Sequence, residues 1–221
     1  MAQEGNLTRR IIGMLSARIP KLGIKKHLTD PRDARGQQWE LESLVTAMLV
    51  GLMAGCKNLS EVERLTAELS SATRKMLGIL RRIADTTMRD LAVALSPHEV
   101  CALIRVSAQQ AVRSKAVEPV GLPLDVVSMD GKTTAVEELD NQWAQTHKDN
   151  DGLGACGLVR TITCTLVSSL AKVCLEVVPM GHKSNEVGFF KTAFEQLYTH
   201  HKSSFDMVTY DAGAYSAANA E

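Results

Sequence analysis

The sequence predicts a mixed α/β protein in which a helical region precedes the first half of a mixed β-sheet. Apolar residues recur at steps of three and four up to about residue 118, which is the helical period, and strand-like alternation follows residue 123. Between the two patterns, 118–123 contains two prolines and a glycine. We therefore expect a basic N-terminal segment at 1–36, a helical domain at 37–118 and a partial sheet domain at 124–221.

Length and composition indicate an ordinary globular protein. The chain has 221 residues, of which 45% are hydrophobic and 23% charged, so it is neither disordered nor fibrous. The longest uncharged apolar run, from Leu44 to Cys56, spans 13 residues, whereas a bilayer-spanning helix needs about 20. No apolar segment typical of a secretory signal lies near the N-terminus. We expect a cytoplasmic protein with no membrane span.

Charge and cysteine content narrow the possible partners. The formal net charge is zero, but residues 1–36 hold eight basic residues against three acidic ones. This local excess of five positive charges indicates a polyanionic partner, and a solvated basic tail is the alternative. The five cysteines form no C-x-x-C pair, which argues against a zinc site or a disulfide framework. We expect reduced thiols in packed positions, with Cys164 and Cys174 in the core on facing strands.

Four helices are expected in the first half of the chain. The first is closed by Gly55, the second begins at a capping box formed by Ser60 and Glu63, and the fourth has Pro97 in its first turn. The expected ranges are 40–54, 60–69, 85–95 and 97–115. Short helices with tight turns are also typical of helix-turn-helix DNA readers, and most small helical bundles are not DNA readers. The basic residues around these helices are Arg74, Lys75, Arg81, Arg82 and Arg89.

The second half of the chain predicts three strands, a crossover helix and a fourth strand. The expected ranges are 124–130, 158–169, 171–178, a helix at 184–201 and a last strand at 205–210. Strands two and three form an antiparallel hairpin in this interpretation, and the crossover helix makes strand four parallel to strand one. The polar stretch 131–157 is interpreted as an exposed insertion.

Two aspartates carry the candidate chemistry. Asp130 and Asp211 each follow an apolar strand, precede a small residue and stand 81 positions apart. If strands one and four are parallel neighbours, about 5 Å apart, the two carboxylates face one another, which is unfavourable unless a cation lies between them. Magnesium prefers such oxygen ligands, and a metal pair promotes phosphodiester displacement. The alternative is that each aspartate only supports a turn.

Three spaced motifs resemble one family. Met129-Asp130-Gly131-Lys132, the run from His182 to Glu186 and Tyr210-Asp211-Ala212-Gly213 are similar to the DDE transposases of bacterial insertion sequences. The stretch at 30–36, the helix end at 52–55 and Asp85-Thr86-Thr87 resemble the helical region that precedes the catalytic domain in that family. The resemblance extends over nearly the whole chain from about residue 30.

The resemblance implies an RNase H-like fold and DNA cleavage with strand transfer at insertion-sequence ends. It implies Asp130 and Asp211 as metal ligands for Mg²⁺ or Mn²⁺, double-stranded DNA as partner, a homo-oligomer on DNA and no small-molecule cofactor. Asn185 and Glu186 match a family signature, and phosphate contact, support of a metal ligand and helix capping all remain open for them. Lys132 and Lys183 are candidate phosphate contacts or solvated lysines. Further candidate DNA contacts are Arg9, Arg10, Lys25, Lys26, Arg81 and Arg82.

The family's third acidic residue has no counterpart in this sequence. Glu221 follows Asp211 by only ten residues with no strand between them, so it is not assigned that role. We therefore expect a truncated transposase that is inactive by itself. Two alternatives are a remnant that binds DNA or a full-length partner, and a nonfunctional relic with an uncovered sheet edge. The sequence contains no Walker phosphate loop and no G-x-S-x-G elbow, and His200-His201 is interpreted as a polar helix terminus.

Overall fold

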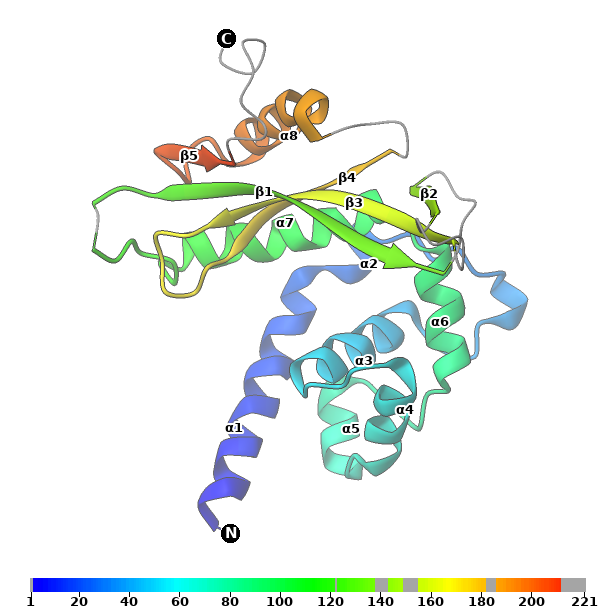
Figure 1. Cartoon of the computed structure of the whole chain (residues 1–221). Coiled ribbons are helices and arrows are strands. Elements are labelled where there is room, and N and C mark those ends of the chain that lie inside the picture. Colours follow the sequence, from blue (N-terminus) through cyan, green and yellow to red (C-terminus); the bar gives the residue numbers. More distant parts are fainter. Residues whose placement is uncertain (1, 122, 138–142, 149–154, 182–185, 212–221) are drawn as a thin grey trace. The chain divides into compact units, whose positions relative to one another are not determined.

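The chain is a mixed α/β protein with N-terminal helices, a five-stranded mixed sheet and a C-terminal helix (Figure 1). A computed structural model describes residues 2–121, 123–137, 143–148, 155–181 and 186–211. It forms two compact units, 1–103 and 104–221, and the helix α7 (Pro97–Arg113) passes from one into the other. The sequence instead places the change at 118–123. The difference arises because the second half of α7 packs with the sheet residues, before the proline and glycine breaks are reached.

The first unit consists of helices from the N-terminus onward. Residues 1–36 are not a solvated tail, because Leu15, Ile19, Ile24 and Leu28 are buried in the same cluster as the helix α3. The helices are α1 (Ala2–Arg18), α2 (Ile24–His27), α3 (Leu41–Met53), α4 (Leu59–Glu68), α5 (Ser71–Leu77) and α6 (Asp85–Ala94), with short 3₁₀ turns at Ile19–Leu22 and Ala34–Gly36. The expected helices at 40–54, 85–95 and 97–115 are thus confirmed within a few residues, and α1, α2 and α5 were not predicted.

The start of α4 corrects one sequence prediction. The capping box lies two residues earlier than predicted. The Asn58 side-chain oxygen accepts a hydrogen bond from the Glu61 amide at 2.9 Å, and the Glu61 carboxylate accepts one from the Lys57 amide at 2.8 Å. Ser60 and Glu63 are used differently. Ser60 Oγ donates a hydrogen bond to the Asp85 carboxylate at 2.8 Å, and the Glu63 carboxylate accepts a hydrogen bond from the Asp85 amide at 2.9 Å. The residues that were predicted to cap α4 therefore tie α4 to the first turn of α6.

The second unit is built on one sheet with the order β2-β3-β1-β5, in which β4 also pairs with β3. The strands are β1 (Val126–Val136), β2 (Ala144–Lys148), β3 (Ala155–Leu166), β4 (Cys174–Met180) and β5 (Met207–Tyr210), with α8 (Glu186–His201) between β4 and β5. The predicted antiparallel hairpin of β3 with β4 and the predicted parallel pairing of β1 with β5 are both confirmed.

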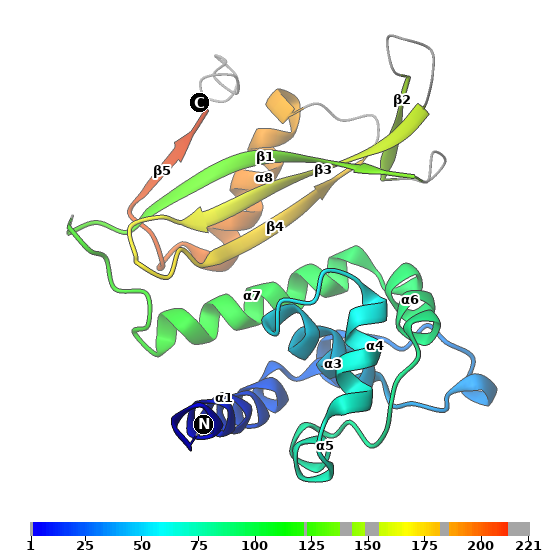
Figure 2. The same cartoon turned by 60° about the horizontal axis from the view of Figure 1, so that its bottom comes forward.

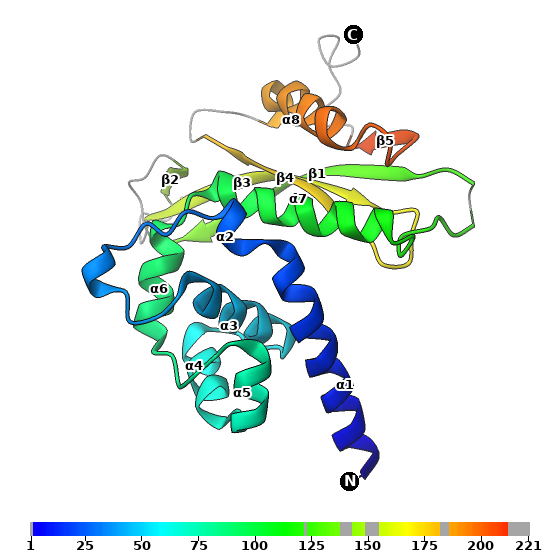
Figure 3. The same cartoon turned by 180° about the vertical axis from the view of Figure 1, so that it is seen from behind.

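Two helices cover the two faces of this sheet. Figures 1 and 3 show α8 on one face and α7 on the other, and Figure 2 shows α8 running behind β1 and β3. On the α8 side, Phe190, Ala193 and Leu197 are buried with the core residues of the strands. Phe190 also packs on Tyr210 of β5, with ring centroids 4.6 Å apart. This packing fixes the position of β5 beside β1.

The prediction that 131–157 is an exposed insertion was wrong in part. β1 continues six residues past Asp130, and β2 pairs with β3 from Ala144 opposite Val159 to Lys148 opposite Ala155. Asp130 is therefore an interior residue of a long strand, and the turn role considered for Asp130-Gly131 is excluded. What ends near Asp130 is the pairing with β5, whose last partners are Met129 and Tyr210.

Candidate functional site

Parallel pairing brings the two candidate metal ligands to one end of the β1–β5 ladder. The register pairs Val126 with Met207 and ends with Met129 opposite Tyr210. Asp130 and Asp211 are the next residue on each strand, so they stand at equivalent positions just past the last pair. Adjacent strands lie about 4.8 Å apart, which places both carboxylates within reach of one cation.

A small hollow at this point is lined by both aspartates. Its walls are Met129, Asp130, Gly131, Ile162, Phe190, Tyr210 and Asp211. Both aspartates are exposed, whereas Met129 and Ile162 beneath them are buried. The Asp130 carbonyl accepts a hydrogen bond from Thr163 Oγ1 at 3.2 Å. A rigid, buried base therefore carries two carboxylates that face solvent.

Two carboxylates provide part of the ligand set that a hard divalent cation needs. Two carboxylates supply the oxygen ligands that Mg²⁺ prefers, and this ion commonly keeps several waters and takes the rest of its shell from substrate phosphate. Within the described residues, no group of three or more histidine, cysteine, aspartate or glutamate side chains is arranged to hold a metal. The strand ends thus bring together two of the acidic residues that the family resemblance predicts as metal ligands.

The other candidate residues of the sheet unit have different outcomes. Lys132 is exposed on β1, two residues past Asp130. Lys183 and Asn185 lie outside the described residues. Glu186 is the first residue of α8, and its side chain also lies outside the described part. The three possible roles of Asn185 and Glu186 therefore remain as the sequence left them.

A second hollow adjoins the aspartates and was not predicted. It encloses about 230 Å³ and is lined by Gly131, Lys132, Thr133, Arg160, Thr161 and Met180. Gly131 belongs to the walls of both hollows. Arg160 comes from β3, opposite Thr133 in the register, and has no signal in the sequence that sets it apart from an ordinary strand residue.

A buried carboxylate is the other feature that the sequence did not reveal. The Glu176 side chain on β4 is fully buried and accepts two hydrogen bonds from Arg105 of α7, at 2.9 and 2.7 Å. His200 Nδ1 lies 3.1 Å from Glu176 Oε2, and the fully buried His201 lies 3.6 Å from it. Burial acts to raise the pKa of Glu176, but the neighbouring His201 and Arg105 outweigh it and lower this pKa to about 2. His200 and His201 thus lie against a buried carboxylate, so they are not merely a polar helix terminus.

The prediction of packed thiols holds in part. None of the five cysteines, all of which the structure describes, forms a disulfide; Cys101 and Cys164 are buried, and Cys56, Cys156 and Cys174 are half-buried. Cys164 on β3 and Cys174 on β4 lie on paired strands, one residue out of direct register. Burial raises the pKa of Cys164 to about 12, so this thiol stays protonated and unreactive at neutral pH.

Some of the candidate DNA-contacting residues of the first unit form ion pairs with carboxylates, and others do not. Lys25 pairs with Glu40 at 2.9 Å and with Glu42 at 3.2 Å, and Arg82 pairs with Glu63. Arg10 and Lys26 are exposed, and the side chain of Arg9 lies outside the described part. Arg81 forms no ion pair among the described residues, and its guanidinium lies over the Trp39 ring, 4.7 Å from the centroid.

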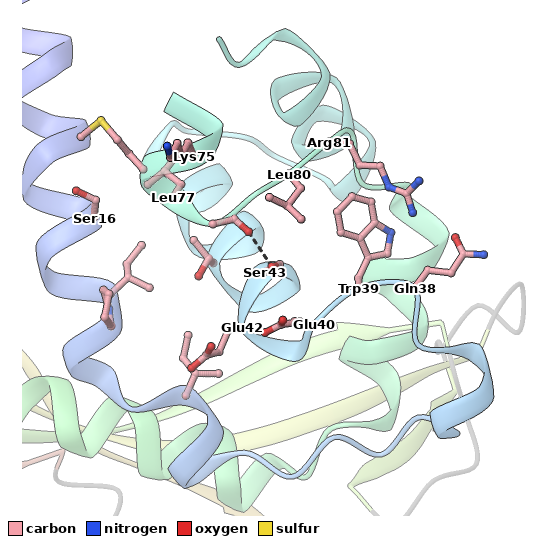
Figure 4. A pocket seen from close by; sticks show the side chains of 16 residues that line it. Ser16, Gln38, Trp39, Glu40, Glu42, Ser43, Lys75, Leu77, Leu80 and Arg81 are labelled. Carbon is pink, nitrogen blue, oxygen red and sulfur yellow. Dashed lines mark hydrogen bonds between the residues drawn. The ribbon is translucent and has the colours of Figure 1, made fainter. Parts of the chain in front are cut away.

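Trp39 and Arg81 belong to the wall of a groove in the first unit (Figure 4). It encloses about 760 Å³ between α1, the start of α3 and the segment that follows α5. Its floor includes Ile24 and Leu77, both buried, while Leu80 on its rim is 79% exposed. Ser43 Oγ donates to the Gly78 carbonyl at 2.8 Å and closes one side. The groove therefore combines an apolar floor with charged walls, which carry the cations Lys75 and Arg81 and the carboxylates Glu40 and Glu42. Both carboxylates pair with Lys25.

No family model, curated protein or solved structure matches the chain. Among the described residues, no single helix is long and apolar enough to cross a membrane, and one sharply bent pair, Asp85–Ala94 with Pro97–Arg113, passes that test by length and composition only.

Proposed function

We propose that this chain carries two metal ligands of a DDE-type transposase site, which acts on double-stranded DNA by cleavage and strand transfer. The observation that supports it best is the register of β1 with β5, which places Asp130 and Asp211 side by side. The sheet order, with a crossover helix before a parallel fifth strand, is also what an RNase H-like half-sheet requires. The additional β2 is an elaboration of that pattern.

In this proposal Asp130 and Asp211 hold Mg²⁺ or Mn²⁺ from the exposed side of the hollow. The metal, when bound, would activate the attacking oxygen and stabilise the leaving oxygen of the phosphodiester. The buried base of Met129 and Ile162 keeps both strands in place, so the carboxylates are preorganised for the ion. Because the described residues contribute only two carboxylates, we expect metal binding without DNA cleavage by this chain.

Manganese titration followed by electron paramagnetic resonance tests the metal site in the full 221-residue chain. We expect saturable Mn²⁺ binding. Asp130→Asn and Asp211→Asn should each weaken the Mn²⁺ affinity by more than about 10- to 100-fold, which is the usual cost of losing a residue that only hydrogen-bonds to a metal ligand. Glu195→Gln removes an exposed carboxylate of α8 and serves as the control. Binding that is unchanged in both aspartate variants would refute the proposed site.

A second candidate function is a DNA-binding module that does not depend on catalysis. The groove at Trp39 favours it, because Lys75 and Arg81 on its rim have no carboxylate partner in the described part of the chain. Aromatic and arginine side chains beside unpaired cations are typical of nucleic-acid-binding surfaces. This role is compatible with a remnant that interferes with a full-length transposase.

Two neighbouring arginines provide a matched test of this second candidate. Trp143→Phe leaves Trp39 as the only tryptophan, so its fluorescence reports binding of a duplex oligonucleotide in the groove. In this background we expect Arg81→Gln to lower the salt slope of binding by about 1, as for loss of one phosphate contact. Arg82→Gln removes the same charge from a residue already paired with Glu63, and it should leave the slope unchanged. Equal effects of the two variants would exclude the groove as the contact surface.

A further inference from the structure

The strand register sorts the side chains of β1 and β3 onto the two faces of the sheet. Side chains alternate along each strand, and residues directly opposite each other point to the same face. Met129 and Ile162 lie on the buried face, where Phe190 of α8 packs beside them. Asp130, which is paired with Thr163, belongs to the opposite face. We call this opposite face the open face.

Two rows of polar side chains cross the open face. The first row consists of Asp211, Asp130 and Thr163, and the second consists of Lys132 and its direct partner Thr161. The rows are two residues apart along β1, which corresponds to about 7 Å. The second half of α7 lies on this side of the sheet (Figure 3), but Asp130, Lys132 and Asp211 are all exposed. A nucleic-acid strand can therefore reach the aspartates and Lys132 from the same side.

Lys132 and Thr161 carry polar groups that the protein itself does not use. Within the described part of the chain, Lys132 forms no ion pair and Thr161 forms no side-chain hydrogen bond. Thr163 differs, because its Oγ1 donates a hydrogen bond to the Asp130 carbonyl at 3.2 Å and so ties β3 to the aspartate. Directly paired residues have Cβ atoms about 5 Å apart, so the Lys132 ammonium and the Thr161 hydroxyl can donate to one oxyanion.

The charges of the open face show why a cation is useful beside the aspartates. Asp130 and Asp211 repel a phosphate that approaches from solvent, and Lys132 offsets part of this repulsion on its own row. Lysine is a flexible point charge with three donors, which suits contact with a phosphate. Arg160 cannot replace it, because Arg160 pairs with Thr133, one residue out of phase with Lys132, and so belongs to the other face.

We propose that the DNA strand lies on the open face and that Lys132, assisted by Thr161, binds a phosphate beside the one held at Asp130 and Asp211. Phosphates rise about 3.4 Å per nucleotide, so a spacing of about 7 Å places this contact within about two nucleotides of the reacting bond. The inference rests on the proposed function and adds to it the face and the residue that position the substrate strand. Lys132 is a positioning residue, since its row contains no metal ligand.

Salt-dependent DNA binding in the presence of EDTA tests the inference without any contribution from a metal. The 221-residue chain is titrated with a fluorescein-labelled duplex at several salt concentrations, and the slope of log K against log salt is compared between variants. We expect Lys132→Met to lower the magnitude of the slope by about 1, whereas Lys132→Arg, which keeps the charge, retains it. Thr161→Val removes a neutral hydroxyl, so it should weaken binding about 10-fold and leave the slope unchanged.

Two variants control for the loss of one positive charge. Arg160→Met removes a charge from the other face of the same pair of strands, and Lys191→Met removes an exposed charge from α8. Both should leave the slope unchanged, because neither residue lies on the open face.

The outcomes separate this inference from the proposed function. A salt-dependent slope that Lys132→Met does not change would overturn the inference and leave the proposed metal site standing. Equal losses of slope in Lys132→Met and Lys191→Met would also overturn it, because the DNA would then not be confined to the open face. Absence of salt-dependent binding by the unsubstituted chain would overturn both the inference and the proposed DNA substrate. The Mn²⁺ titration of Asp130→Asn described above decides the metal site independently.

Discussion

At the scale of single residues, Glu176 is notable because it is a charged side chain in the interior of the sheet unit. Its carboxylate is fully buried and lies against Arg105, His200 and His201, which come from α7 and α8. Such a cluster is not strong evidence for net stability, because desolvation of the charges offsets much of their attraction. Loss of one member is costly all the same, since it leaves a buried charge without its partner.

We predict that the stability of the protein decreases in acid because of this residue. The pKa of Glu176 is lowered to about 2 in the fold from its ordinary value of 4.5, so its contribution to stability is complete above about pH 4.5. That contribution is lost as the pH falls from 4.5 towards 2, because protonation then favours the unfolded state. Glu176→Gln should cost about 3 to 5 kcal/mol at neutral pH and flatten the acid part of the curve. Urea unfolding between pH 2.5 and 7 measures both effects.

The control for this experiment is Glu195→Gln, which changes an exposed carboxylate of α8. It should shift the free energy of unfolding by less than about 0.5 kcal/mol at every pH. An acid profile of Glu176→Gln that runs parallel to that of the unsubstituted protein would contradict the role given to Glu176.

The residues of the candidate site differ in how visible they were in the sequence. Asp130 and Asp211 were predicted because each follows an apolar strand and precedes a small residue, which is a local pattern. Thr161 and Glu176 carry no local pattern. Their importance comes from partners 29 and 71 positions away, Lys132 and Arg105, which only the strand register and the packing of α7 bring near.

At the scale of elements, the sequence predicted strands and helices whose apolar period is strong and missed those that long-range pairing stabilises. α3, α6, α7 and α8 were expected close to their observed bounds. Most of the second half of β1 is polar and exposed, as are Gln145, Thr146 and His147 of β2, so their period gave no signal. They are strands because both pair with β3, and such tertiary pairing overrides local propensity.

The contact between α3 and α4 gives a prediction at this scale. Gly51 of α3 faces Val62 of α4, and a Cβ atom at Gly51 would overlap Val62 Cγ2 and lie 3.1 Å from Cγ1. Val62 is buried and branched at Cβ, so it cannot turn aside freely. We predict that Gly51→Ala destabilises the protein by about 1 to 3 kcal/mol, as overpacking does, despite the better helix propensity of alanine. Thermal unfolding followed by circular dichroism measures the change.

Gly13 provides the matched comparison in α1. No atom lies within 4 Å of a Cβ built there, so Gly13→Ala gains helix propensity without a clash. It should stabilise the protein by up to about 1 kcal/mol. If both substitutions stabilise the protein, the close approach of α3 to α4 at Gly51 is not a constraint on the fold.

At the scale of the whole molecule, charge is balanced in sum and unequal along the chain. Eight of the 25 basic residues but only three of the 25 acidic residues lie within 1–36, so the other 185 residues carry an equal excess of five negative charges. The protein as a whole does not attract DNA, because its net charge is zero. The proposed DNA binding must therefore come from local clusters of cations. It should be more sensitive to salt than the net charge of zero suggests.

The same distribution predicts how the free protein behaves in solution. At its isoelectric point near pH 7.0, net repulsion between molecules vanishes, and the basic segment of one molecule attracts the acidic remainder of another. We predict a minimum of solubility near pH 7 that 0.15 M salt relieves, because the Debye length there is about 8 Å and screens this attraction. Static light scattering at pH 5.5, 7 and 8.5, with and without salt, measures it. If the attraction at pH 7 is unaffected by salt, exposed apolar groups such as Leu80 and Leu170 are its cause instead, because apolar association is not weakened by screening.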